Sequence, residues 1–378
     1  MARKKTAQKA ESKVSLWNGP FVDGITASWL ARFLVCRERF RLRVVEGLRY
    51  VEEFDHAIEY GSMFHEAIEV YLLTKKVEKA LSKIKEYSLG LRKRYTSSTD
   101  EISFWTKLCL AQFKSYIRFL QQNHDSSRKE LLQEDVFRVP YYLSPDIFPI
   151  ILRGKYDSVH SIANRTRKSH NLYLEENKTK KYISERNIGE TLHGNLQSMF
   201  YIICLSESIK GDVITNLPQK PEGVKLPAQS KLAGISYRVI RRPLEEKMPI
   251  RQRKSENQDD FIKRVALRFD EEPEYYFYKM HCTLSKKEID DYRTQILEPI
   301  LWSVIKWWDW IEVDPFDPWS IKGTRRPSDK GIHFKMPWGV YNSLSGGYNG
   351  DFYELLTKGS DVGLIKTTEL FPELQCPL

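Results

Sequence analysis

Three residues near the middle of the chain have the types and spacing needed to hold a divalent cation. Asp157 interrupts a run of β-favouring residues at 148–159, and nineteen residues later Glu176 closes a second run at 172–176. Lys178 follows by two positions, so on an extended strand it points the same way as Glu176. If the two strands are neighbours, the two carboxylates meet. Two carboxylates can bind a hard cation through oxygen, and an adjacent ammonium can steer a water molecule.

Two carboxylates and a lysine are the smallest set of residues that could hydrolyse a phosphodiester bond with a metal ion. The same residue types also occur on protein surfaces that have no catalytic role. A Glu-x-Lys on a strand is usually a solvated face that carries a weak ion pair. Short motifs of this kind also match by chance. The interpretation of Asp157, Glu176 and Lys178 therefore depends on the segments that precede and follow them in the sequence.

Downstream, a polar pair lies on a predicted helix. Apolar residues recur at helical spacing between Thr191 and Leu205. Gln197 and Tyr201 stand four positions apart, so they share one face of that helix. An amide and a phenol there could orient a scissile phosphate or the acidic ligands. The alternative is that Tyr201 is a core aromatic and Gln197 a surface residue, and for Tyr201 alone the alternative is favoured.

Upstream, a predicted amphipathic helix at 61–72 offers a histidine. His65 and Glu69 are four apart and share a face. Neutral imidazole is a common ligand of divalent metals, manganese included. A lone helical histidine is more often packed or exposed than a ligand. Glu69 is expected beside the ligands or as a helix-face charge, not as a direct ligand.

Taken in order, these motifs resemble the PD-(D/E)XK nuclease superfamily and, within it, the RecB-like exonuclease branch. Each motif is weak alone, but five in the right order make a strong signal. The matching stretches run from about residue 28 to residue 205, and they are Ser28–Phe40, Gly61–His65, Gly154–Asp157, Glu176–Thr179 and Gln197–Tyr201.

The resemblance implies a fold and a metal site. The fold is α/β: a restriction-endonuclease-like mixed sheet flanked by helices, with a helical N-terminal region. One or two Mg²⁺ or Mn²⁺ ions would be held by His65, Asp157 and Glu176, joined by the backbone carbonyl of Asn177. Glu176 fits the Glu-x-Lys spacing, and strand alternation turns the preceding Glu175 away from Asp157.

The remaining site residues also follow from the resemblance. Lys178 would position or polarise the attacking water and stabilise charge in the transition state. Gln197 and Tyr201 would complete the site near the DNA backbone.

The same resemblance implies a metal-dependent deoxyribonuclease. The expected action is exonucleolytic, on duplex ends or single strands of DNA, in recombination, repair, or phage or defence DNA processing. A protein partner in a recombination or repair complex is a further expectation. One alternative is a structure-selective or single-strand endonuclease. Another, outside catalysis, is a nuclease-fold subunit that binds DNA without chemistry, although the intact Asp157, Glu176 and Lys178 disfavour it.

The cysteine pattern differs from that of several RecB-like nucleases, which bind an iron–sulfur cluster through one cysteine near the N-terminus and three near the C-terminus. Cys36 stands where the early one would be, but Cys376 is the only late one. Cys109, Cys204 and Cys282 show no ligand spacing. We therefore expect no iron–sulfur cluster. Five scattered cysteines also argue for a reducing compartment.

The composition limits the class of protein to which the chain can belong. The 378 residues are 41% hydrophobic, which is ample for a substantial core, and carry a net charge of +10. A basic surplus suits a polyanionic partner, although it does not establish one. No apolar run reaches membrane-spanning length, and the N-terminus lacks a hydrophobic signal core. The expectation is a cytoplasmic protein with no membrane partner.

The chain is predicted to be a disordered basic tail at 1–14 followed by one elaborated nuclease domain at 15–378. That domain is divided into a helical part at 15–130 that carries His65, a catalytic core at 131–312 and a wrap-around tail at 313–378. Within the core, strands are predicted at 133–143, 148–161 and 170–177, mostly antiparallel, and then at 232–240 and 274–282. Helices are predicted at 187–210 and 286–312.

Two segments of the sequence each allow two interpretations. The densely charged stretch at 241–264 is interpreted as a flexible clamp over nucleic acid or as a solvated insertion. The tryptophans at 302, 307, 308 and 310 favour a core role for most of the rings, because apolar residues surround them at helical spacing. Stacking on single-stranded bases is the minority alternative.

Overall fold

The computed structural model describes residues 16–50, 53–123, 125–164, 168–181, 188–215, 222–244, 251–312 and 362–367. The predicted tail at 1–14, Cys376 and most of 313–378 lie outside them. The chain divides into two units. Unit 1 comprises Met1–Val51, Pro140–Leu152 and Leu297–Leu378, and unit 2 comprises Glu52–Val139 and Arg153–Ile296.

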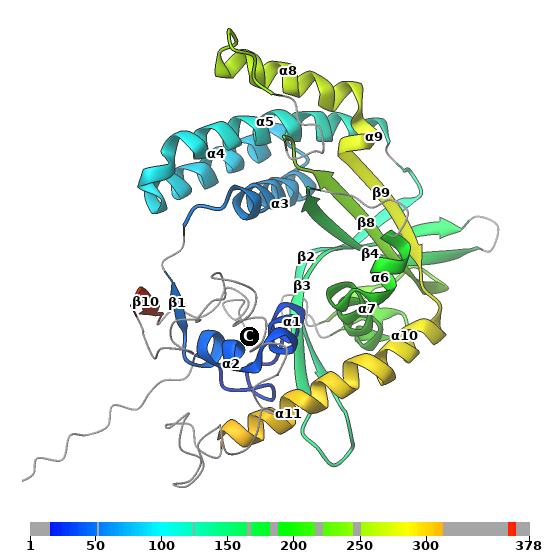
Figure 1. Cartoon of the computed structure of the whole chain (residues 1–378). Helices are drawn as coiled ribbons and strands as arrows, with labels where there is room; N and C mark the ends of the chain where they lie inside the picture. Colours follow the sequence, from blue (N-terminus) through cyan, green and yellow to red (C-terminus); the bar gives the residue numbers. More distant parts are fainter. Residues whose placement is uncertain are drawn as a thin grey trace, which may run out of the picture. The chain divides into compact units, whose positions relative to one another are not determined.

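A mixed five-stranded sheet carries the central part of the chain (Figure 1). Its strand order is β2-β3-β4-β8-β9. The strands are β2 (Arg128–Tyr141), β3 (Ile150–Asn164), β4 (Ser169–Lys180), β8 (Ser230–Arg241) and β9 (Phe277–Thr283). β4 pairs antiparallel with β3 but parallel with β8, and β8 pairs antiparallel with β9. The predicted mixed sheet is therefore confirmed, and 232–240 is a strand of that sheet.

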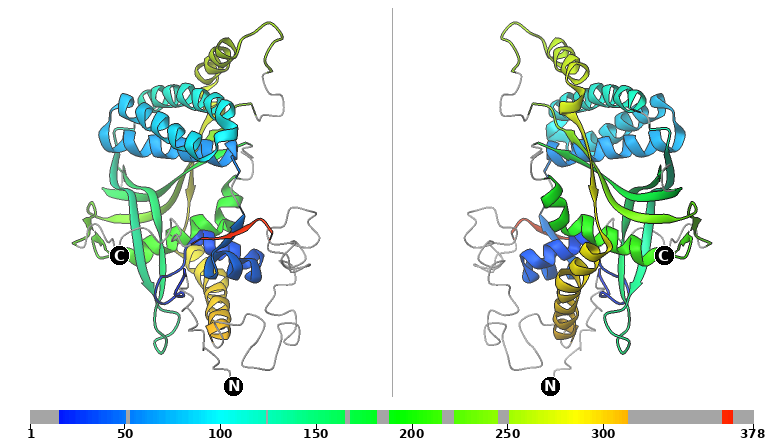
Figure 2. Two further views of the ribbon diagram at one scale, coloured as in Figure 1. Left: turned by 90° about the vertical axis from the view of Figure 1, so that its left-hand side faces the viewer. Right: turned by 90° about the vertical axis from the view of Figure 1, so that its right-hand side faces the viewer.

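Helices of unit 2 pack on the sheet through a continuous apolar core. Its buried residues come from α3 (His56–Thr74), α4 (Val77–Arg94), α5 (Thr99–Gln122) and α8 (Gln258–Glu271), and they include Ile240 and Phe277 of the sheet. Rings of Tyr116 and Phe119 on α5 lie 5.3 and 5.5 Å from the ring of Phe277. In both turned views α3, α4 and α5 lie together (Figure 2). The flanking helices complete the predicted α/β class.

The segment after β4 forms two helices. These are α6 (Ile188–Gly194) and α7 (Leu196–Ser208), where one helix at 187–210 was predicted. The break occurs because Asn195 is extended and its side chain accepts a hydrogen bond from the Ser198 N–H, so it caps a new helix. A small sheet of β5 (Ile209–Lys210), β6 (Val213–Ile214) and β7 (Val224–Lys225) follows.

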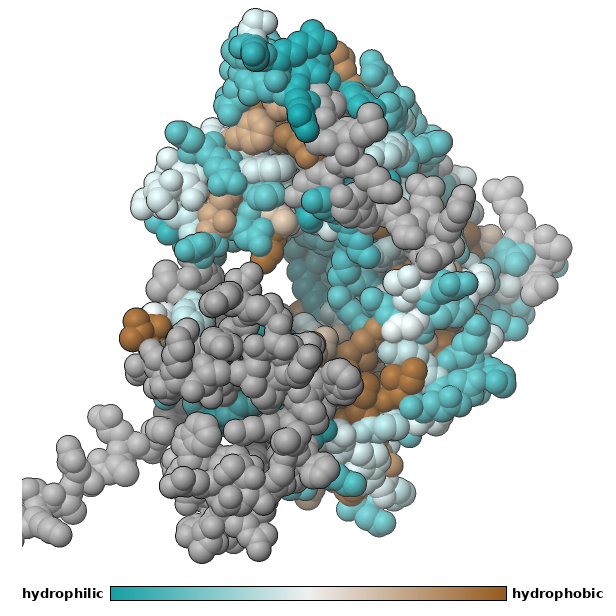
Figure 3. Space-filling model, in the orientation of Figure 1, coloured by the Kyte–Doolittle hydropathy of each residue, from teal (hydrophilic) through white to brown (hydrophobic). Residues whose placement is uncertain are grey.

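One further prediction on unit 2 needs correction, and one open interpretation gains a structural detail. Residues 274–276 were assigned to a strand but belong to the short helix α9 (Pro273–Tyr276), because Pro273 sits at its first turn. In the charged stretch at 241–264, for which a flexible clamp over nucleic acid or a solvated insertion was predicted, residues 258–264 belong to α8. That helix buries Phe261, Val265 and Phe269, and the visible surface over it is mostly hydrophilic (Figure 3).

Unit 1 packs around a cluster of edge-to-face aromatic rings. Its helices are α1 (Ala27–Val35), α2 (Arg37–Phe40), the π-helix η1 (Arg41–Val45) and α11 (Glu298–Glu312), and β1 (Leu48–Tyr50) pairs with β10 (Leu364–Lys366). The Trp17 ring lies 4.9 Å from Trp308 and 5.4 Å from Phe40, and the Phe40 ring lies 5.5 Å from Trp307. Trp307 and Trp308 are buried, which confirms the core role predicted for them.

The helix predicted at 286–312 is interrupted by a π-helical turn. It divides into α10 (Lys286–Tyr292), η4 (Arg293–Leu297) and α11. No helix of the residues that the structure describes combines the length and apolar character that a membrane crossing requires.

Strand β4 carries a buried ion network on the face that α5 covers. Glu175 is 1% exposed, and its carboxylate lies 2.6 Å from Arg128 Nη1 and 3.1 Å from Arg238 Nη1. Burial alone would raise the pKa of Glu175, but the two guanidinium groups lower it to about 2. The ionised carboxylate therefore joins β2 to β8 across two intervening strands.

Replacing Glu175 by alanine should destabilise the protein by about 3–5 kcal/mol, because two guanidinium groups then lose their buried counter-charge. Urea unfolding at neutral pH measures the loss. The matched control, Glu271→Ala at an exposed position of α8, should change stability by less than about 0.5 kcal/mol. A loss below about 1 kcal/mol for Glu175→Ala would contradict this account of the network.

Candidate active site

The site begins where β3 parts from β4. The two strands are paired from Asn164↔Ser169 to Ser158↔Glu175, and the register ends there. Asp157 is the next residue of β3, and its Oδ2 accepts a hydrogen bond of 2.7 Å from the backbone N–H of Asn177. The Asp157 carboxylate thus accepts a hydrogen bond from the backbone N–H that lies next to the point where the pairing of β3 with β4 ends. This bond fixes the position of Asp157 beside β4.

Glu176 and Lys178 lie on the other face of β4 from Glu175, and they contact each other. Lys178 Nζ is 2.8 Å from Glu176 Oε1 and donates a hydrogen bond of 3.0 Å to Gln197 Oε1. Glu176 is 2% exposed, and its Oε2 accepts a hydrogen bond from Ser198 Oγ at 2.7 Å. The first turn of α7 therefore holds both charged residues.

The charge states follow from this geometry. Burial alone would lower the pKa of Lys178, but Glu176 and then Asp157 raise it, so Lys178 is an ammonium. An ammonium can donate hydrogen bonds and cannot act as a base. In this arrangement Lys178 can therefore orient a water molecule or stabilise negative charge.

His65 approaches the same strand from α3. Its pKa is lowered to about 4 by burial and by the Lys178 cation, against the opposing effects of Glu176 and a hydrogen bond with the backbone of Asn177. The imidazole is therefore neutral near pH 7, the form that binds metals. Gly61 permits the approach, since a Cβ there would lie 2.7 Å from Thr179 Oγ1.

Tyr201 is partly buried and packs beneath β3. Its ring lies 5.3 Å from the Phe137 ring and 6.0 Å from the Tyr156 ring. Gly154 fits against this group, because a Cβ would meet Phe137 at 2.7 Å and Tyr201 at 3.1 Å. Burial raises the pKa of Tyr201 well above its usual value. The structure thus gives Tyr201 a packing role close to Asp157.

Lys155 and Glu134, two charged residues beside the site, were missed by the sequence reasoning, whereas Glu69 was expected there. Lys155 Nζ lies 2.7 Å from Glu134 Oε2 and 3.3 Å from Glu69 Oε2. Glu134 has a φ of +49°, a left-handed conformation that is rare for glutamate. Such a conformation within β2 cannot be read from the sequence. Lys155 stands two positions before Asp157, which is the one sequence signal that could have pointed to it.

Ser198 was also missed. Its hydroxyl reaches Glu176 because Asn195 starts α7 and so places Ser198 in the first turn. The Asn195 cap is readable from sequence, since asparagine is a favoured N-cap residue.

Two carboxyl groups at the site have raised pKa values. Burial raises the pKa of Asp157 to about 7, against the effects of the Asn177 N–H and Lys178. Burial and the nearby Asp157 raise the pKa of Glu134 to about 7, although Lys155 opposes the shift. A crowded set of carboxyl groups that resists full ionisation favours an added cation.

The chemistry of the donors fits a hard divalent cation. Two carboxylates, a neutral imidazole and a backbone carbonyl suit Mg²⁺ or Mn²⁺. Glu176 Oε1 is buried and accepts no hydrogen bond from the residues that the structure describes, its near neighbour being the Lys178 ammonium. Within those residues, no three His, Cys, Asp or Glu side chains converge into a ready metal cluster. A bound ion would therefore have to draw the ligands together.

Among the residues that the structure describes, no cysteine joins a group of potential metal ligands. Cys36, Cys109, Cys204 and Cys282 are all buried free thiols. Burial raises the pKa of Cys109, Cys204 and Cys282.

Comparison with known families agrees with the geometry. The model of the PD-(D/E)XK nuclease superfamily matches residues 25–291, more than half of the chain. The match contains every candidate site residue from His65 to Tyr201. No curated protein matches the chain.

The raised pKa of Asp157 predicts how the stability of the metal-free protein depends on pH. The folded-state pKa, about 7, is above the ordinary value of 3.8, so the folded state holds the proton more tightly. The contribution of Asp157 to stability should therefore fall as pH rises from about 4 to about 7, by at most about 1.4 kcal/mol per pH unit, and then level off. Asp157→Asn should remove this decline.

Urea unfolding in EDTA between pH 4 and pH 8 measures the effect, with Asp212→Asn at an exposed position as the control. Added Mg²⁺ or Mn²⁺ should stabilise the wild-type protein at pH 8 more than the Asp157→Asn variant, because a ligand that binds only the folded state stabilises it. Identical pH profiles for wild type and Asp157→Asn would contradict the assignment.

Proposed function

Because this chain belongs to the PD-(D/E)XK nuclease superfamily, we propose that it hydrolyses phosphodiester bonds of DNA as a metal-dependent exonuclease. The observation that carries the proposal is the arrangement around β4. Asp157 is bound to the Asn177 N–H, and Glu176 and Lys178 are joined to each other and held by the first turn of α7.

The proposed ligands of the ion are His65, Asp157, Glu176 and the backbone carbonyl of Asn177. Mg²⁺ and Mn²⁺ are the expected ions, because oxygen donors predominate. When bound, a divalent ion polarises the phosphate and offsets the charge that develops on the leaving oxygen. The neutral state of His65 and the nearby Asp157 and Glu176 carboxyl groups support this assignment.

Lys178 is proposed to orient the attacking water and to stabilise negative charge on the phosphate in the transition state. Its ammonium is pre-positioned by contacts on two sides, with Glu176 and with Gln197. Gln197 therefore acts through Lys178, by holding its Nζ. Tyr201 supports the strand that carries Asp157 through its packing against Gly154. Such pre-positioning lowers the reorganisation needed at the moment of reaction.

The choice of DNA ends as substrate rests on two observations. It comes from the resemblance of the five motifs to the RecB-like branch and from the net charge of +10, which suits a polyanion. The proposed setting is recombination, repair, or phage or defence DNA processing inside the cell. A protein partner in such a complex belongs to the same proposal.

Incubation with linear and circular duplex DNA, and with single-stranded DNA, in Mg²⁺ or Mn²⁺ tests the proposal. Progressive loss of linear DNA with intact circles is the expected result, and EDTA should abolish it. Nicked circles would instead show an endonuclease. A gel shift without any cleavage would overturn the catalytic proposal and leave a DNA-binding protein.

Single substitutions test the roles assigned to the site. Asp157→Asn and Lys178→Met should each lower kcat by at least about 100-fold, because each removes a group that acts in the transition state. Gln197→Ala should have a smaller effect, since it only releases the Lys178 ammonium. The matched control is Lys279→Met, an exposed lysine of β9 on the face away from Glu176. Cleavage by Lys178→Met at the wild-type rate would refute the mechanism.

A further inference from the structure

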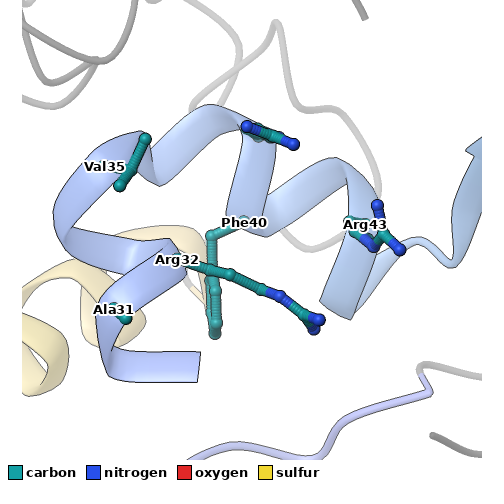
Figure 4. A pocket seen from close by; sticks show the side chains of 6 residues that line it. Ala31, Arg32, Val35, Phe40 and Arg43 are labelled. Carbon is teal, nitrogen blue, oxygen red and sulfur yellow. The ribbon is translucent and has the colours of Figure 1, made fainter. Parts of the chain in front are cut away.

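Unit 1 has a hollow of about 190 Å³ beside α1, α2 and η1, but each of its arginines already interacts with another group (Figure 4). The residues that line it are Ala31, Arg32, Val35, Arg39, Phe40 and Arg43. A cation without an acidic partner among the described residues lies instead in unit 2. It is Lys180, at the end of the strand that carries the candidate active site.

Lys180 continues a row of charged residues along β4. Residues two apart on a strand share a face, so Glu176, Lys178 and Lys180 point the same way. Exposure rises along the row, since Glu176 is buried, Lys178 is partly exposed and Lys180 is exposed. Two residues of a strand cover roughly 6.6 Å. Lys180 therefore lies one step beyond Lys178, on the same face and toward solvent.

The charge of Lys180 is not neutralised by a carboxylate of the residues that the structure describes. Its side-chain contact is with the ring of Tyr237, whose centroid lies 5.3 Å from Lys180 Nζ. Burial and then the Lys178 cation lower the pKa of Lys180, and the Glu176 carboxylate offsets them only in part. In contrast, Lys178 Nζ and Lys155 Nζ lie 2.8 and 2.7 Å from carboxylate oxygens.

The Tyr237 ring holds Lys180 in place and leaves its charge intact. Tyr237 is 4% exposed, and it pairs with Glu176 across β4 and β8. The face of an aromatic ring attracts a cation because of its quadrupole, not because of a net charge. An ammonium has three N–H donors, so those that point away from the ring can bind another acceptor.

A phosphate oxygen is an acceptor that suits this position. The lysine ammonium binds phosphate as a compact point charge. If the phosphate that is cut lies at Lys178, the next phosphate of the same strand lies toward one of its neighbours. Successive phosphates of a strand are at least about 3.4 Å apart. The flexible four-carbon stem of Lys180 allows its ammonium to reach the neighbouring phosphate from one step along β4.

We propose that Lys180 binds the backbone phosphate next to the one that is cut and so positions the strand in the active site. The identity of the ligand rests on the proposed nuclease function, whereas the free charge rests on the contacts of Lys180. Backbone contacts of this kind fix the register of a strand without reading its sequence. Lys178 acts on the reacting phosphate, and Lys180 binds its neighbour.

Fluorescence anisotropy with a short labelled oligothymidine measures the phosphate contact. The full-length protein is used in EDTA, so that binding is measured without cleavage. Lys180→Gln should weaken binding about three- to tenfold and reduce the slope of log K against log salt by about 0.7, the value for one contact with a single strand. Lys279→Gln, the matched change at an exposed lysine on the opposite face of the sheet, should have less effect on both quantities.

Two comparisons separate a phosphate contact from a structural role. Lys180→Arg keeps the charge, so it should retain most of the affinity that Lys180→Gln loses. A methylphosphonate strand lacks the backbone charge, so wild type and Lys180→Gln should bind it equally. Wild-type affinity and salt slope in Lys180→Gln would overturn the proposal. A loss of affinity for the methylphosphonate strand as large as the loss for the charged strand would also overturn it.

Steady-state cleavage in Mg²⁺ distinguishes the role of Lys180 from that of Lys178. Lys180→Gln should raise KM about three- to tenfold and leave kcat within about twofold of wild type, because a neighbouring phosphate is held equally in the ground state and the transition state. A fall in kcat as large as that expected for Lys178→Met would contradict the assignment of Lys180 to the neighbouring phosphate.

The two proposals fail in different ways. If wild type cleaves no DNA but Lys180→Gln weakens salt-dependent binding, the proposed nuclease function fails and the phosphate contact stands. If wild type cleaves DNA and Lys180→Gln matches it in affinity, salt slope and KM, only the Lys180 proposal fails.

Discussion

The separation of β3 from β4 at Asp157 is the feature on which the rest of the candidate site depends. Paired strands satisfy each other's backbone groups, so a strand that leaves the ladder exposes an N–H that needs a partner. The Asp157 carboxylate supplies that partner at Asn177. This hydrogen bond satisfies the backbone N–H of Asn177, and it also fixes the position of Asp157, a candidate metal ligand. The Asn177 carbonyl and His65 then lie beside it, and Glu176 and Lys178 flank it along the strand.

Strand β4 also separates two carboxylates that are adjacent in sequence but differ in electrostatic environment. Glu175 lies between two guanidinium groups and has a pKa lowered to about 2, so it is a permanent anion within the sheet. Glu176 faces α7, an ammonium and a hydroxyl. Alternation along an extended strand is enough to produce this division. One residue therefore belongs to the buried ion network while its neighbour faces the candidate site.

Close approach of the elements is permitted by two glycines. Gly61 lets α3 reach Thr179, and Gly154 lets β3 lie against the rings of Phe137 and Tyr201. Each belongs to a motif whose candidate site residue follows a few positions later, His65 in one case and Asp157 in the other. The glycines are therefore part of the positioning machinery. In unit 1 the packing is of a different kind, since edge-to-face aromatic rings support a surface that is rich in arginine.

The sequence by itself determined the superfamily, the mixed α/β sheet, the core tryptophans and the candidate residues His65, Asp157, Glu176, Lys178, Gln197 and Tyr201, because these follow from residue type, local period and motif order. Only the tertiary structure decided how the candidates are held. The Asp157 bond to Asn177, the Ser198 contact, the left-handed Glu134 with Lys155, and the parallel pairing of β4 with β8 all join segments distant in sequence or need a backbone turn that no residue type specifies. Local patterns fix which face a side chain takes, whereas the register between strands fixes what that side chain meets.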